Sequence, residues 1–172
     1  MHDIGLAAWF GGSLMGAVGL NGAAAAVRDT EDRTRIAAVG WGKWAPVNAA
    51  AIAVHSIGGI ALIAGNAGRV VGQKGARSNT VVKSVLTLAA MGVTAYSGSQ
   101  GAKLGKEAPV PAAGATEPNA ATPAETASAQ RRLKALQWAI PTLTGVLLVM
   151  TAQQGEQQKP SQLVKGFLGA KG

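Results

Sequence analysis

The chain has 172 residues, of which 48% are hydrophobic and only 14% are charged, about half the charged fraction of a typical soluble domain. Aromatic residues make up 4%, too few to supply the large side chains on which a soluble core of this size depends. The absence of cysteine excludes disulfides, thiolate metal sites, iron–sulfur clusters and cysteine nucleophiles.

All charged residues lie outside four stretches of the sequence, which are 4–27, 44–68, 84–102 and 135–155. About 20 uncharged, mainly apolar residues in a helix cross the hydrocarbon core of a membrane. Helices of a soluble protein would carry charges on their wet faces at helical spacing, and these stretches carry none. We therefore predict an all-α integral membrane protein, a four-helix bundle that forms one membrane domain over residues 1–172.

The first predicted helix, 4–27, has a start unlike a signal peptide and a row of small residues. Asp3 stands where a signal peptide carries positive charge, and no short apolar core leads to a cleavage site. We therefore expect this helix to remain in the mature protein. Gly12 and Gly16 form a GxxxG motif that Gly19 extends, and such spacing lets two helices approach closely. These glycines are predicted to face another helix or a partner.

The second predicted helix, 44–68, holds His55, the one titratable side chain deep in a predicted span. An ionisable residue at this depth is a functional candidate, because imidazole can relay protons or bind a metal. No acid lies in the spans, so a neutral His55 bonded to a neighbouring helix is the simpler interpretation. His55 and Asn66 are the candidate intramembrane polar site, and Gly59 and Gly65 are further candidates for helix packing or a partner interface.

The end of this second helix carries a family resemblance. Residues 58–69 read Gly-Gly-Ile-Ala-Leu-Ile-Ala-Gly-Asn-Ala-Gly-Arg, which is similar to the second helix of the DoxX-like family of small four-span bacterial membrane proteins. The resemblance implies a four-span fold. The thiol-redox role of some members does not transfer to a chain without cysteine. In composition and size the chain also resembles actinobacterial accessory subunits of mycobacterial envelope complexes, such as the Mce lipid importers and the respiratory supercomplexes.

The segments outside the spans differ in character. The second connection carries basic residues without an acid, and these are predicted to contact anionic lipid headgroups: Arg69, Lys74, Arg77 and Lys83. The third connection, 103–134, is rich in Pro and Ala and is predicted to be a long flexible loop between the third and fourth helices. The tail, 156–172, fits either a basic amphipathic segment on the membrane surface or a frayed end.

The placement of the helices in a membrane follows from aromatic and basic residues. Trp41 and Trp44 flank the start of the second helix, where interfacial tryptophans are common. Four spans place both termini on one side of the inner (plasma) membrane. The Lys and Arg residues near the helix ends are divided almost evenly, with a weak lean that places both termini outside.

These features predict a non-enzymatic accessory or stabilising subunit of a larger membrane complex, with a cell-envelope lipid transport system as the first choice. The alternatives are an accessory subunit of a respiratory complex, or a small self-sufficient transporter or channel in which His55 and Asn66 lie near a polar path. We expect no catalytic residues, no metal and no cofactor. The expected partners are a larger membrane complex and membrane lipids, without nucleic acid. A homo-oligomer is compatible with the sequence but not favoured.

Overall fold

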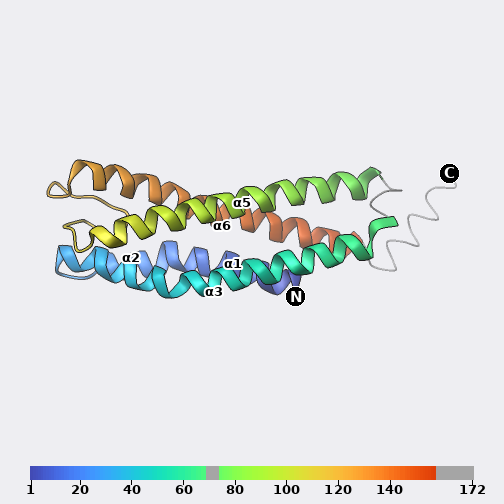
Figure 1. Ribbon diagram of the computed structural model, residues 1–172, viewed down its shortest axis with the longest axis horizontal. Helices are drawn as coiled ribbons and strands as arrows, with labels where there is room; N and C mark the ends of the chain where they lie inside the picture. Colours follow the sequence, from blue (N-terminus) through green and yellow to red (C-terminus); the bar gives the residue numbers. More distant parts are fainter. Residues whose placement is uncertain (69–73, 158–172) are drawn as a thin grey trace.

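The computed structural model describes residues 1–68 and 74–157, and this part of the chain is helical with short turns and one longer loop (Figure 1). It contains no strand in these two ranges. The elements in chain order are α1 (His2–Met15), the π-helix η1 (Gly16–Leu20), α2 (Asn21–Ala25), α3 (Thr30–Gly65), α5 (Lys74–Glu107) and α6 (Ala124–Gln157).

Four helical segments are long and apolar enough to cross a membrane, and they are His2–Ala25, Thr30–Gly65, Arg77–Glu107 and Ala124–Gln153. The first consists of α1, η1 and α2, which follow one another without a break. This confirms the predicted all-helical class and the four membrane-length helices. It is compatible with a multi-pass membrane protein.

Three helices extend well beyond the charge-free stretches, and α3 shows why. It begins at Thr30, ahead of the expected start at residue 44, because Asp29 caps it by accepting a hydrogen bond from the Glu31 backbone N–H at 2.9 Å. Acidic side chains in the first turn, from Glu31 and Asp32, also suit the positive end of the helix dipole. With 36 residues, α3 is about 54 Å long, more than the roughly 30 Å hydrocarbon core.

The connection between α5 and α6 is shorter than the expected 103–134, because both helices continue through their charged ends and leave only 108–123 outside. This loop also follows a defined path along the start of α3. The Thr34 hydroxyl accepts from the Val110 N–H at 3.0 Å and donates to the Val110 carbonyl at 3.1 Å, while Arg33 donates to the Ala113 carbonyl at 3.0 Å. The contacts tie a segment rich in Pro and Ala to one end of the helices.

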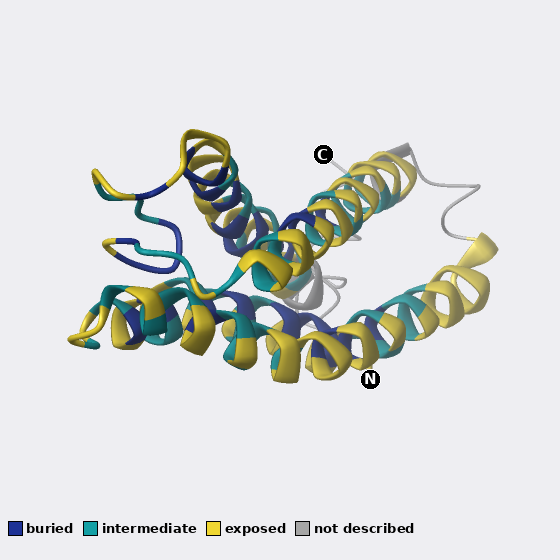
Figure 2. Cartoon of the chain, turned by 60° about the vertical axis from the view of Figure 1, so that its left-hand side comes forward, coloured by how far each residue is buried: buried dark blue, intermediate teal, exposed yellow. Residues whose placement is uncertain are grey.

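The helices bury an apolar cluster and also leave large apolar side chains exposed. The most extensive contacts join α5 to α6, α1 to α3 and α1 to α6, whereas α3 and α5 meet less closely. Large apolar side chains remain exposed, for example Ile57, Ile60, Val85, Leu88 and Val149. Exposed positions run along the outer sides of the helices (Figure 2). The buried core contains Leu6, Trp9, Ala51, Ala90, Ile140 and Leu147. Exposed apolar faces on this scale suit contact with lipid chains rather than water.

Candidate functional site

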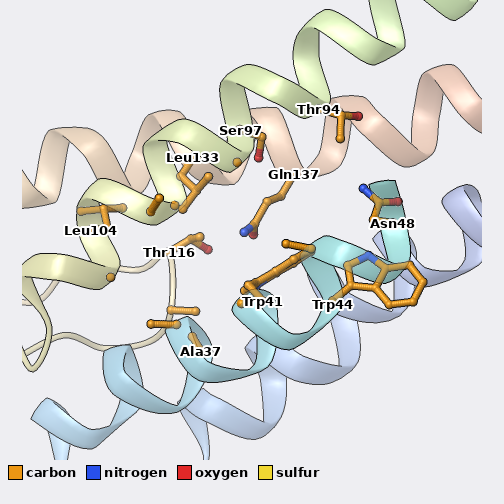
Figure 3. Close-up of a pocket in the computed structure, with 18 of the residues that line it drawn as sticks. Ala37, Trp41, Trp44, Asn48, Thr94, Ser97, Leu104, Thr116, Leu133 and Gln137 are labelled. Carbon is orange, nitrogen blue, oxygen red and sulfur yellow. The ribbon is translucent and has the colours of Figure 1, made fainter. Parts of the chain in front are cut away.

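A cavity of about 830 Å³ lies between α3, α5 and α6, and the 108–123 loop covers one end of it (Figure 3). Its volume falls within the range of about 300–1,000 Å³ that is usual for small-molecule sites. Most of its surface is apolar, and the apolar side chains include Ala37, Ile52, Met91, Leu104, Leu133 and Ile140. The lining residues include a single charged one, Lys106, which is exposed at the loop end.

The lining residues that are exposed all belong to α3 and α5, which places the opening of the cavity between these two helices. Among its lining residues, Ala45 and Ala49 of α3 and Ala95 and Ala102 of α5 are exposed. All four lie within the charge-free parts of their helices, the parts that match a hydrocarbon core in length. In a membrane this opening would therefore face lipid chains.

Two tryptophans of α3 form one wall of the cavity and rest on glycines of the first segment. A Cβ atom added at Gly12 would overlap the Trp44 ring, and one added at Gly16 would overlap the Trp41 ring. The two predicted packing glycines thus lie against aromatic rings of the same chain. The two rings pack between α3 and the first helical segment.

A chain of hydrogen bonds leads from this wall into the cavity. The Trp41 indole N–H donates to Asn21 Oδ1 at 2.9 Å, and Asn21 Nδ2 donates to Gln137 Oε1 at 2.7 Å. An indole can only donate, so the orientation of both amides is determined. The Gln137 amide nitrogen is left without an acceptor in the described part of the chain and points into the cavity (Figure 3).

Further polar groups around the cavity lack partners. The Ser97 side chain is 7% exposed, and its hydroxyl makes no hydrogen bond within the described residues. Four buried side-chain atoms in the described ranges are unpaired, and three belong to lining residues: Trp44 Nε1, Asn48 Oδ1 and Gln130 Oε1. Because buried polar groups are rarely left unpaired, their concentration around one cavity marks it as the candidate site.

The loop end of the cavity is held by Glu117. Its carboxylate accepts from Lys134 Nζ at 3.1 Å, from the Thr116 hydroxyl at 3.0 Å and from the Thr116 N–H at 3.1 Å, and Thr116 itself lines the cavity. Burial alone would raise the pKa of Glu117, but the hydrogen bonds from Lys134 and Thr116 outweigh it and hold the pKa below its usual value.

This loop contact is expected to weaken in acid. A carboxyl whose pKa is lower in the folded state contributes stability above its unfolded pKa of about 4.3, and that contribution is lost as the pH falls through the folded pKa. Because both side chains are partly exposed to solvent, the loss should be on the order of 1 kcal/mol or less. Thermal unfolding between pH 7 and pH 3 should show a larger fall for the wild type than for Glu117→Gln. Equal slopes would contradict this role.

His55 lies away from the cavity, in the interface of α1 and α3. His55 Nδ1 donates to the His2 carbonyl at 3.1 Å, and His2 Nδ1 donates to the His55 carbonyl at 2.8 Å, while the two rings stack at 4.0 Å. Asn66 is exposed at the end of α3 and donates to the Leu62 carbonyl at 2.8 Å. The structure therefore does not bring His55 and Asn66 into one polar site.

The other predicted packing glycines meet different surroundings. Gly59 lies against the His2 ring, with an added Cβ at 3.2 Å from it. Gly19 faces the side chain of Met15 in its own segment, and Gly65 has no atom within 4 Å of an added Cβ. Gly65 therefore makes no close helix contact within the described chain.

Two of the predicted headgroup contacts, Arg77 and Lys83, lie in the first turns of α5, at the end of this helix remote from the 108–123 loop. Arg77 is exposed. Lys83 is half-buried and interacts electrostatically with Asp3. Arg69, the side chain of Lys74 and most of the 156–172 tail lie outside the described residues.

Apart from Trp41 and Trp44, the residues that line the cavity are not singled out by the sequence analysis. Asn21 and Gln137 are separated by 116 positions, and no pattern links them. A usable signal was the presence of uncharged polar side chains inside charge-free stretches, because such groups need partners in a membrane.

Comparisons with protein-family models, curated proteins and solved structures found no match to this chain.

Proposed function

We propose that this chain is a non-enzymatic, multi-pass inner-membrane protein, a four-helix bundle that serves as an accessory subunit of a larger cell-envelope complex. A lipid transport system is the host that the cavity favours. The contribution of the subunit is to hold an apolar molecule between α3, α5 and α6. We also propose that both termini lie on the outer side.

The observation that carries this proposal is the sideways opening of an apolar cavity between the charge-free parts of α3 and α5. A lipid chain can enter such an opening directly from the bilayer. An aqueous channel would instead need a polar path along the helices, and the exposed lining of this cavity in the charge-free parts of α3 and α5 is apolar, with alanines such as Ala49 and Ala95.

The self-sufficient transporter is less well supported, because its two proposed polar residues are apart. His55 exchanges hydrogen bonds with His2. Asn66 lies 11 positions after His55 in the sequence, which is about 16 Å along a helix. A respiratory host would account for the accessory role but gives no specific reason for the cavity.

The test is mass spectrometry of the proteins that co-purify with a chromosomally tagged copy from gently solubilised native membranes. We expect one complex of fixed stoichiometry that contains lipid-transport components. A monomer or homodimer without a stoichiometric partner would overturn the accessory role. A complex of respiratory subunits would retain that role and change the host.

A further inference from the structure

We propose that the cavity binds one uncharged, elongated lipid whose polar end carries a carbonyl oxygen, and that Gln137 and Ser97 donate hydrogen bonds to this oxygen. This inference rests on the proposed lipid-holding function and specifies its ligand.

The direction of the hydrogen bonds from Trp41 through Asn21 to Gln137 determines that the ligand must accept a hydrogen bond from Gln137. The donor-only indole of Trp41 turns the Asn21 oxygen toward itself, so Asn21 presents its nitrogen to the Gln137 oxygen. The Gln137 NH₂ group is then the only end of this amide available to a ligand. Hydrogen bonds in a chain polarise one another, which strengthens the last donor.

Gln137 and Ser97 approach the same part of the cavity from different helices. Gln137 belongs to α6 and is 5% exposed, while Ser97 belongs to α5 and is 7% exposed (Figure 3). Both side chains point into the space above the Trp41 ring. A buried donor without an acceptor costs free energy, so a carbonyl oxygen at this point would remove that cost.

The remaining lining excludes a charged ligand. Lys106 is the single charged side chain among the lining residues, and it lies at the exposed loop end. It follows Ser97 by nine positions, which is about 14 Å along α5. An ionised headgroup beside Gln137 would lose its hydration without gaining a partner of opposite charge.

The shape of the cavity suits one extended chain. Its lining runs over 34–52 on α3, about 27 Å, and over 126–140 on α6, about 21 Å. The volume of about 830 Å³ is that of a site for a single small molecule rather than for several lipids.

The test compares three ligands with the same chain length: methyl palmitate, hexadecane and palmitate. The full chain is purified and delipidated in dodecyl maltoside, a detergent without a carbonyl group, and binding is measured by native mass spectrometry. The two hydrogen bonds to the ester carbonyl should together make methyl palmitate bind about tenfold more tightly than hexadecane. Palmitate should bind more weakly than methyl palmitate at pH 8.

Variants locate the effect. Gly101→Leu should abolish binding of both neutral ligands, because Gly101 lines the cavity and an added Cβ meets no atom within 4 Å. Gly92→Leu is the matched control, since Gly92 is on the same helix with equal space but outside the cavity. Gln137→Leu should reduce the preference for the ester to within about twofold.

Gln137→Leu also removes the acceptor of Asn21 and could therefore disturb the packing. Ser97→Ala is the second variant, because the Ser97 hydroxyl makes no hydrogen bond within the described residues that the replacement would break. It should reduce the ester preference about threefold, whereas Ser99→Ala, which lies outside the cavity, should not. Equal binding of methyl palmitate and hexadecane to the wild type would overturn this inference and leave the lipid-holding function standing. Binding of neither ligand would overturn both.

Discussion

Replacing Gly5 with alanine is expected to be the most damaging glycine-to-alanine change among the glycines that the structure describes. The new Cβ would lie 2.5 Å from the Ala51 carbonyl oxygen and 2.5 Å from the His55 backbone nitrogen. These are main-chain atoms of α3, which cannot rotate away as a side chain does. We expect a loss of about 3 kcal/mol or more, the upper end of overpacking effects, and a melting temperature roughly 6–12 °C lower in detergent.

Gly11→Ala is the matched control for Gly5→Ala, because it lies on the same helix and its added Cβ meets no atom within 4 Å. Alanine favours a helix over glycine by about 0.5–1 kcal/mol, so this variant should be neutral or slightly more stable. Similar melting temperatures for the two variants would contradict the close approach of α1 to the main chain of α3 at Gly5.

The second prediction concerns two buried asparagines whose replacement by leucine should have opposite effects. Asn21 uses its oxygen for Trp41 and its nitrogen for Gln137, so Asn21→Leu leaves two buried groups unpaired. We expect a loss of about 2–4 kcal/mol. Asn48 has an unpaired buried oxygen, so Asn48→Leu removes an unsatisfied group and should be neutral or stabilising by about 1 kcal/mol.

Leucine keeps the branching at Cγ and the number of heavy atoms of asparagine, and the same replacement is made at both positions, so the difference between the two variants reports on the polar atoms. Thermal unfolding of both variants in one detergent measures the difference. An Asn48→Leu variant as unstable as Asn21→Leu would mean that the Asn48 amide has a structural partner, and its place among the unpaired groups of the cavity would be lost.

The charge-free stretches were sufficient to predict four membrane-length helices, because length and the absence of charge are properties of each segment alone. The positions at which the helices begin and end were harder to predict from the sequence. Asp29 caps α3 well before the hydrophobic part begins, and charged residues such as Arg131 continue α6 outside a hydrocarbon core at little cost. The loop between α5 and α6 was too long in the prediction for the same reason.

The sequence predicted which glycines share one face of a helix, but not which residues of the neighbouring helix they contact. Gly12 and Gly16 must share a face, because positions four apart do so in any helix. That they receive the rings of Trp44 and Trp41, and that Gly5 makes the closest main-chain approach, depends on how far α1 is shifted along α3. No residue in either helix specifies that shift alone.

The sequence by itself determined the all-helical class, the four membrane-length segments and the exclusion of cysteine chemistry, since these depend on composition and local order. Only the tertiary structure decided that a cavity lies between α3, α5 and α6, and that Gln137 points an unpaired amide NH₂ group into it. The reason is that both features arise from side chains far apart in sequence, such as Asn21 and Gln137, whose meeting depends on the packing of the helices as a whole.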